Sequence, residues 1–139
     1  MEKALTPAEL DRIIDAHYKA ESSMDIPTIL ESYTDDIEFD VGGMPEPFRG
    51  KEAAAGFYKQ LFSDLVTEKV TPLRSRKHGP NFVIDDAMYE CRAVGRPFGL
   101  EGKNRPVTFR LMHIFEVRDG RICRENAWLD MGAIQRQLG

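Results

Sequence analysis

Hydrophobic residues recur with helical spacing in the first half of the chain and alternate with polar residues in the second half. Residues 6–20 open with a capping box and a proline, which are typical of a helix start, and continue with apolar residues three and four positions apart. Residues 23–33 predict a second, short helix capped by Asp25. Residues 51–65 predict a third helix with one apolar face.

Alternating polar and apolar residues predict a short strand at 36–41 and, after residue 66, a run of strands joined by loops. Asp85 and Asp86 are expected to form a tight turn between two of these strands. Strands are predicted at 36–41, 66–78, 81–84, 87–95, 107–117 and 121–130. A short terminal helix is predicted at 131–139, with Asp130 as its cap.

Helices followed by antiparallel strands predict an α+β fold in which the helices pack on one face of a sheet. We expect a cone-shaped, curved and mostly antiparallel sheet with three helices on its concave side. Residues 1–139 then form a single domain, because no repeat or low-complexity segment interrupts the pattern. A pocket between the sheet and the first and third helices is the natural place for a ligand.

The composition argues against several classes of protein. Of 139 residues, 42% are hydrophobic and 30% are charged, which is typical of a globular domain rather than a disordered one. The formal net charge of -4 argues against nucleic acid as the main partner. No apolar run approaches the roughly 20 residues that span a bilayer, and the first residues lack the apolar core of a signal peptide. We therefore expect a cytoplasmic protein that does not contact a membrane.

Cys91 and Cys123 both fall within predicted strands and are not spaced as a Cys-x-x-C pair. A disulfide framework or a zinc knuckle is therefore not expected, and two reduced thiols are. These residues imply neither a metal nor a cofactor.

One polar residue interrupts the apolar face of the strand at 107–117. Phe109 and Phe115 share a face because strand side chains alternate, and the same face carries His113. A second histidine, His17, falls on the apolar face of the first helix. A histidine in such a place either bonds to a neighbouring core group or titrates near neutrality as an acid or base. Both interpretations stand at this point.

Three segments carry a resemblance to a known family: YTDDIEF at 33–39, FRGKEAAAGFYKQLF at 48–62 and HIFEVRDGRICRENAWLDMGAIQRQLG at 113–139. With the order of elements, they resemble the nuclear transport factor 2-like superfamily, particularly its SnoaL-like and ketosteroid-isomerase-like members. The resemblance covers nearly the whole chain and implies the cone fold. Its members include isomerases, dehydratases, polyketide cyclases, epoxide hydrolases and proteins without known catalysis, so the fold does not name the reaction.

The acidic residues used by those relatives are missing at the positions that resemble theirs. The position of the isomerase base is Val41, and Asp40 beside it faces the other way unless a bulge shifts the register. Limonene-epoxide-hydrolase-like members carry an arginine and an aspartate two residues apart on one strand, and the corresponding positions here resemble Cys91 and Ala93. SnoaL-like cyclases and those hydrolases carry an aspartate on the last strand, and that position here resembles Ala127. We therefore transfer no family reaction to this chain.

The resemblance places Glu125 on the inner face of the last strand, and alternation then places Tyr89 and His113 on the inner face of their strands. His17 joins them from the first helix. We expect His113 to act as the acid or base and Glu125 as its orienting partner or as the alternate base. His17 is expected to polarise the substrate, and Tyr89 either assists it as a donor or serves only in packing. The residues expected to line the pocket around them are Tyr18, Tyr33, Phe39, Val41, Phe57, Leu61, Cys91, Phe109, Leu111, Ala127 and Leu129.

This set of residues predicts a cofactor-independent enzyme for isomerisation, cyclisation or dehydration of a small apolar substrate with a carbonyl or hydroxyl group. The competing hypothesis is a non-catalytic protein that binds a small apolar ligand in the same pocket, which the missing aspartates favour. Two histidines and a carboxylate are also the ligand set of a mononuclear iron site, although the resemblance implies no metal.

The outer face of the sheet is expected to mix arginine, aromatic and apolar side chains, a composition that suits a protein interface. The resemblance implies a symmetric homodimer through this face. The alternative is a solvated face with Trp128 tucked beneath the terminal helix. The polar and aromatic residues predicted on the outer face are Glu90, Arg92, Arg110, Arg124, Asn126 and Trp128.

Overall fold

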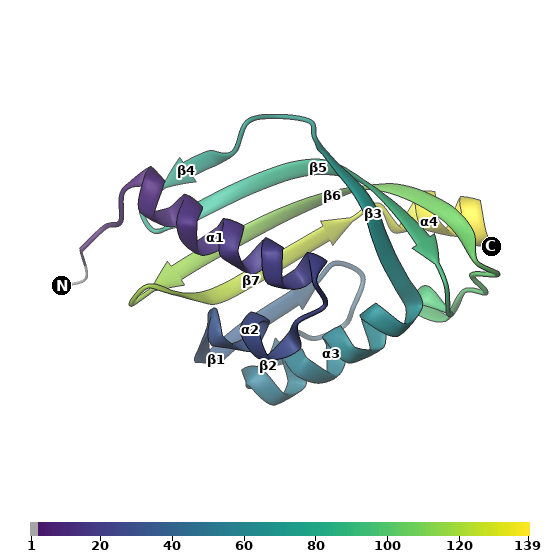
Figure 1. Ribbon diagram of the computed structural model, residues 1–139, viewed down its shortest axis with the longest axis horizontal. Helices are drawn as coiled ribbons and strands as arrows, with labels where there is room; N and C mark the ends of the chain where they lie inside the picture. Colours follow the sequence, from purple (N-terminus) through teal and green to yellow (C-terminus); the bar gives the residue numbers. More distant parts are fainter. Residues whose placement is uncertain (1–2) are drawn as a thin grey trace.

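A curved sheet forms one layer of the protein, and helices α1, α2 and α3 lie on its concave side (Figure 1). The computed structural model describes residues 3–139. The helices are α1 Pro7–Ser22, α2 Ile26–Glu31, α3 Gly50–Asp64 and α4 Met131–Leu138, with a 3-10 turn η1 at Pro97–Gly99. The strands are β1 Tyr33–Val41, β2 Phe48–Arg49, β3 Leu65–Pro72, β4 Lys77–Gly79, β5 Phe82–Ala93, β6 Arg105–Arg118 and β7 Arg121–Leu129. This arrangement confirms the predicted α+β fold. None of the described helices combines the length and the apolar character that crossing a membrane requires.

The strands pair in the order β2-β1-β7-β6-β5-β3, and β4 pairs with β5. Adjacent strands are antiparallel, except that β1 and β7 run parallel. Because β1 follows α2 directly, this parallel pairing brings the first two helices beside the last strand. The register sets Phe39 opposite Glu125 and Asp85 opposite His113. Residues far apart in the sequence thus become neighbours on the concave face.

The starts of the helices agree with the predicted caps. Thr6 and Glu9 exchange both hydrogen bonds of a capping box at the start of α1. Asp25 and Asp130 each accept a hydrogen bond from a backbone N–H at the start of α2 and α4. Each such cap stabilises its helix by about 1 kcal/mol, because it satisfies an N–H group that has no partner within the helix. Asp130 is therefore a cap, and it does not line the cavity described below.

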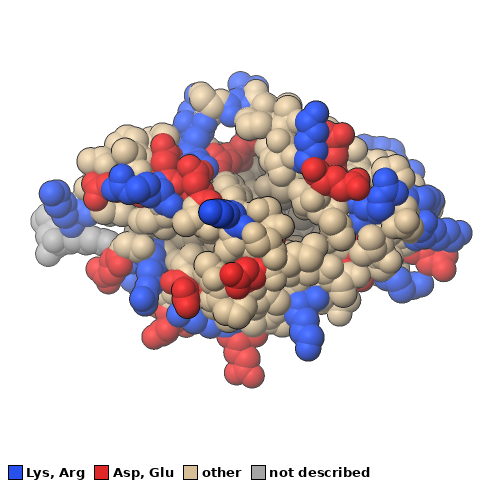
Figure 2. Space-filling model, viewed as in Figure 1, with Lys and Arg blue, Asp and Glu red and all other residues tan. Residues whose placement is uncertain are grey.

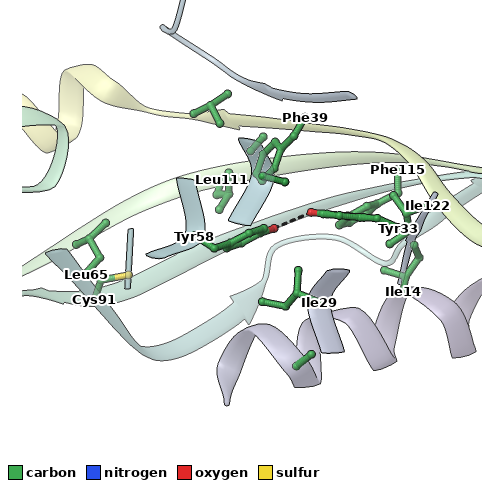
Figure 3. Packing of buried hydrophobic residues seen from close by; sticks show 14 of the residues in the cluster. Ile14, Ile29, Tyr33, Phe39, Tyr58, Leu65, Cys91, Leu111, Phe115 and Ile122 are labelled. Atoms are coloured by element: carbon green, nitrogen blue, oxygen red, sulfur yellow. Dashed lines mark hydrogen bonds between the residues drawn. The ribbon is translucent and has the colours of Figure 1, made fainter. Parts of the chain in front are cut away.

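The core lies between the sheet and the inward faces of the helices. Ile14 of α1, Ile29 of α2 and Tyr58 of α3 are fully buried. Ile14 and Ile29 belong to the same buried cluster as Phe115 and Ile122 of the sheet, and Ile14 lies close to Ile122 (Figure 3). Burying an apolar side chain of this size contributes roughly 1.5–3 kcal/mol. This packing fixes the position of α1, the helix that carries the first histidine.

The predicted turn at Asp85 and Asp86 is wrong, because β5 continues unbroken through both residues. The carboxylate of Asp85 accepts hydrogen bonds from Arg76 and from the hydroxyl of Tyr18. The carboxylate of Asp86, on the opposite face of the strand, is bound by Arg110 of β6. Aspartate disfavours a strand when it has no partner, but here each charge is compensated and the ladder to β6 stays intact.

The outer face of the sheet carries the mixture of side chains that the sequence predicts. Trp128 exposes 56% of its surface and is not tucked beneath α4. Asp40 also points outward, since its carboxylate accepts hydrogen bonds from Arg124 at 2.9 Å and from Asn126 at 3.4 Å. The register of β1 therefore does not bring Asp40 into the cavity. Pairing of two copies through this face stays a prediction.

Gly102 allows a test of the packing between β5 and the loop before β6. A Cβ atom at Gly102 would lie 2.2 Å from the carbonyl oxygen of Ala93 and 2.5 Å from that of Gly95. We expect Gly102→Ala to lower the free energy of unfolding by about 1–3 kcal/mol, because the backbone must move to admit the methyl group. In the matched control Gly56→Ala, within α3, a Cβ meets nothing within 4 Å. That change should raise the free energy of unfolding by about 0.5–1 kcal/mol. Unfolding in urea measures the free energy of unfolding of both variants. Equal changes in the two variants would contradict the described packing of this loop.

Candidate functional site

A cavity of about 830 Å³ opens between the concave face of the sheet, α1, α3 and β3. The space-filling view shows this hollow near the middle of the molecule (Figure 2). Most of the residues that the sequence assigns to a pocket line it. They are Tyr18, Phe39, Val41, Phe57, Leu61, Tyr89, Cys91, Phe109, Leu111, His113, Glu125, Ala127 and Leu129. The other two, His17 and Tyr33, do not line the cavity but lie behind Glu125 in its wall.

Glu125 stands at the centre of this wall, and its side chain is fully buried. Its Oε1 accepts a hydrogen bond of 2.6 Å from the hydroxyl of Tyr33. The hydroxyls of Tyr33 and Tyr58 lie 2.9 Å apart and point toward each other in the core (Figure 3). Since the proton of Tyr33 goes to Glu125, Tyr58 must donate to Tyr33. A chain of two hydroxyls from β1 and α3 thus supports one carboxylate of β7.

His17 faces the same carboxylate from α1. Its Nδ1 lies 2.9 Å from the Oγ of Ser32, and that hydroxyl donates its own proton to the carbonyl of Ile29 at 2.5 Å. Ser32 therefore accepts from His17, which places a hydrogen on Nδ1. Nε2 is then the atom that approaches Glu21 Oε2 at 3.2 Å and Glu125 Oε1 at 3.3 Å.

The two carboxylates change the ionisation of His17. Burial lowers the pKa of His17, but Glu125 and then Glu21 outweigh this effect and raise the pKa to about 10. Because its ring does not line the cavity, the expectation that His17 polarises a substrate is corrected. Its position is instead that of a counter-ion behind the carboxylate.

His113 lines the cavity next to Glu125. Its Nε2 is 3.7 Å from Glu125 Oε2, which is within ion-pair reach but too far for a direct hydrogen bond. The imidazole stacks on Phe115 with ring centres 5.3 Å apart, and the ring of Tyr18 meets it edge-on at 5.5 Å. Tyr89 approaches from β5 with its ring centre 6.1 Å away. Aromatic contacts therefore hold the imidazole in one orientation.

The charges around Glu125 decide its protonation. Burial raises the pKa of Glu125, but His17 first, then His113 and the hydroxyl of Tyr33, outweigh it and hold the pKa below its usual value. Glu125 is therefore a carboxylate at neutral pH, although no part of its side chain is exposed. A buried carboxylate beside a histidine that reaches a cavity can support the transfer of a proton.

A second ionic group lies at the mouth of the cavity, and the sequence did not reveal it. Arg76 binds Asp85 with two nitrogens and also bonds Asp11 and Asp15 of α1, each at 2.9 Å. The hydroxyl of Tyr18 donates to the same Asp85 at 2.9 Å. Tyr18 has only one proton, so it can offer a ligand acceptor lone pairs but no donor. The hairpin of β4 and β5 brings Arg76, the residue before β4, close to Asp85, but no local signal joins the pair to α1.

The iron-type triad considered for His17, His113 and Glu125 does not form. In the described part of the chain, the residues whose ligand atoms come within 4.8 Å of one another are His17, Glu21 and Glu125. Glu21 takes the place expected for His113. The sequence could have indicated Glu21, because it follows His17 by four residues on α1 and residues four apart on a helix share a face.

Comparison with known proteins agrees with the fold. A family model described as the SnoaL-like domain matches residues 14–125. A proposed SnoaL-like polyketide cyclase from Jannaschia sp. CCS1 is 15% identical, with a TM-score of 0.83, 99% of this chain and 97% of that chain being covered. A proposed polyketide cyclase from Pseudomonas putida KT2440 is also 15% identical, with a TM-score of 0.81 and coverage of 94% and 98%. An LEH-like epoxide hydrolase from M. tuberculosis is 22% identical, with a TM-score of 0.72 and coverage of 94% and 90%. At these identities the structural matches show the fold alone. Among curated proteins, none matches the chain significantly.

The hydrogen bond from Tyr33 to Glu125 can be tested by removing one oxygen atom. Tyr33→Phe takes a donor from the buried carboxylate and leaves the hydroxyl of Tyr58 without its acceptor. We expect this variant to lose about 2–3 kcal/mol of unfolding free energy, since a bond to a charged group is lost. Tyr89→Phe is the matched control, because the hydroxyl of Tyr89 makes no hydrogen bond within the described residues, and it should change stability by less than about 0.5 kcal/mol. Chemical unfolding measures both, and equal losses would show that the Tyr33 bond contributes nothing specific.

Proposed function

The chain belongs to the SnoaL-like domain family, and on that premise we propose that it is a small-molecule enzyme that works by acid/base chemistry. The reaction is an isomerisation, cyclisation or dehydration of an apolar substrate that carries a carbonyl or hydroxyl group. One observation carries the proposal: a buried, ionised Glu125 lies beside His113 at the wall of a largely apolar cavity. Proton transfer of this kind needs no redox cofactor.

His113 is the proposed acid/base. It takes a proton from a carbon next to the carbonyl of the substrate, and Glu125 stabilises the imidazolium that forms. The electron pair left on the substrate moves onto the carbonyl oxygen as an enolate. His113 then returns the proton to another atom of the substrate, so no proton is gained or lost overall. The hydroxyl of Tyr89 lines the cavity and is the candidate donor to the enolate oxygen.

The cavity suits a substrate of modest size and low polarity. Its volume falls within the roughly 300–1,000 Å³ of small-molecule sites. Phe39, Phe57 and Phe109 supply aromatic surface around the polar wall. Burial raises the pKa of the Cys91 thiol to about 11, so this lining residue is a neutral apolar group rather than a nucleophile.

A non-catalytic protein that binds a small apolar ligand is the second candidate. It is supported by Val41, Ala93 and Ala127, which stand where related enzymes have acidic residues. Against it stands the cost of burying Glu125 as an ion, which a purely apolar binding pocket does not require. The names of similar structures include cyclases, an isomerase and an epoxide hydrolase, which favours catalysis within the family.

The proposed assembly is a homodimer through the outer face of the sheet, in the cytoplasm. The exposed Trp128 supports this interface, because aromatic residues are enriched at the centre of protein contacts. The two cysteines are free, as expected in a reducing compartment.

The catalytic assignment is tested with a reaction that does not depend on the natural substrate. Proton–deuterium exchange next to the carbonyl of a panel of cyclic ketones in D2O is followed by NMR, with wild type and His113→Gln. We expect wild type to catalyse exchange of at least one ketone and His113→Gln to lower the rate about 10²–10⁴-fold. His78→Gln is the matched control, because His78 lies outside the cavity and bonds to Asp11.

Three outcomes are distinguishable in this experiment. Loss of exchange in His113→Gln alone, with an unchanged melting temperature, supports the assignment. Unchanged exchange in that variant means that His113 is not the base. If wild type binds a ketone, seen as line broadening of the ligand, but exchanges none in the panel, the binding protein becomes the better hypothesis.

A further inference from the structure

Unsatisfied polar atoms gather at one place behind the wall of the cavity. In residues 3–139, four buried side-chain nitrogen or oxygen atoms lack a hydrogen-bond partner. Two of them, His17 Nε2 and Glu21 Oε2, lie 3.2 Å apart, and a third, Glu125 Oε2, is the oxygen of that carboxylate that lies toward His113. The side chains of His17 and Glu125 are fully buried, so bulk water does not solvate them as it does groups at a surface. Buried polar atoms without a hydrogen-bond partner indicate a site for a bound ion or molecule that the protein side chains do not replace.

Two distances within this group match those between ligands of a single metal ion, and all three ligand atoms lie within 4.8 Å of one another. Nε2 of His17 lies 3.2 Å from Glu21 Oε2 and 3.3 Å from Glu125 Oε1. Two ligand atoms about 2.1 Å from a metal are about 3.0 Å apart at a right angle and about 3.4 Å apart at a tetrahedral angle. A single N–H bond points in one direction, and here neither carboxylate oxygen is aligned with it well enough to form a hydrogen bond. A metal ion can bond to all three side chains at once.

The surroundings of these residues are those of metal ligands. His17 donates its Nδ1–H to Ser32, which leaves Nε2 free to bind a metal and fixes the orientation of the ring. The hydroxyl of Tyr33 orients the carboxylate of Glu125. His17 and Glu21 are four residues apart on α1, so one helix face presents both.

We propose that His17, Glu21 and Glu125 form a binding site for one divalent ion of the zinc or manganese class. One imidazole nitrogen and two carboxylates suit ions of this kind. Glu21 and Glu125 both border the cavity, so the remaining coordination position faces the space where a ligand binds. On binding, the ion takes the place of a proton on His17 Nε2, and that proton leaves to solvent.

This site goes beyond the proposed function, because it depends on three side chains and not on whether the cavity is catalytic. Oε1 of Glu125 lies toward His17 and Oε2 lies toward His113. One oxygen can therefore bind the ion while the other still faces His113. The ion neutralises two carboxylates in the wall and presents a Lewis acid to an oxygen atom of the ligand.

The test is direct binding of the metal alone. Full-length protein without a histidine tag is treated with a chelator, dialysed and titrated with Zn²⁺ and Mn²⁺ by calorimetry. Co²⁺ serves as a spectroscopic probe, because its visible absorption reports the number and kind of ligands. We expect one ion per chain with a dissociation constant in the micromolar range or below. We also expect a Co²⁺ spectrum typical of four or five nitrogen and oxygen ligands.

Glu21→Gln is the decisive variant, because Glu21 is partly exposed and its loss spares the contact between Glu125 and His113. It should weaken Zn²⁺ binding at least 10-fold, whereas Glu52→Gln, an exposed carboxylate on α3, should leave it unchanged. His17→Gln serves as a second ligand variant if Glu21→Gln does not fold. The proposal is overturned if wild type binds no ion stoichiometrically, or if the ligand variants and Glu52→Gln bind equally well. Because no substrate is present, the result is independent of the ketone-exchange experiment.

Discussion

The structure depends on keeping one charged carboxylate, that of Glu125, in the interior. Moving an ionised group out of water costs many kcal/mol unless opposite charges and hydrogen-bond donors compensate it. Three groups on different elements compensate the charge of Glu125. They are His17 of α1, the hydroxyl of Tyr33 of β1 and His113 of β6. The relative positions of α1 and the three central strands are therefore tied to one side chain. A core built of apolar residues alone would not impose this constraint.

The topology makes that compensation possible. β7 lies between β1 and β6, so a side chain on its concave face has neighbours from both ends of the chain. Tyr33 is the first residue of β1, and the parallel pairing sets it opposite Ile122 on β7. The same geometry leaves an apolar cavity on one side of Glu125 and a fully packed core on the other. Glu125 thus marks the boundary between the part of the molecule that stabilises the fold and the part that can bind a ligand.

Much of this was predictable from local rules, and the remainder was not. Capping residues marked the starts of α1, α2 and α4. Alternation placed His113 on the concave face, and the family resemblance placed Glu125 there. The role of His17 was not predictable, because helical spacing shows that a residue is buried but not whether it reaches a cavity. The contacts of Tyr58 with Tyr33 and of Arg76 with α1 join elements distant in sequence, and residue spacing carries no information about them. Asp85 and Asp86 were misassigned to a turn for the same reason, since their partners lie on other elements.

The central claim is that His17 and Glu125 stabilise each other as a buried pair, and a double-mutant cycle measures this most directly. Unfolding free energies are determined in urea, with a chelator present, for wild type, His17→Gln, Glu125→Gln and the double variant. We expect each single change to cost about 3–5 kcal/mol, because it leaves the other partner buried without compensation. The double variant should then cost at least about 1 kcal/mol less than the sum of the two. If the two losses add to within about 0.5 kcal/mol, the residues are not coupled and the account of the carboxylate given above is wrong.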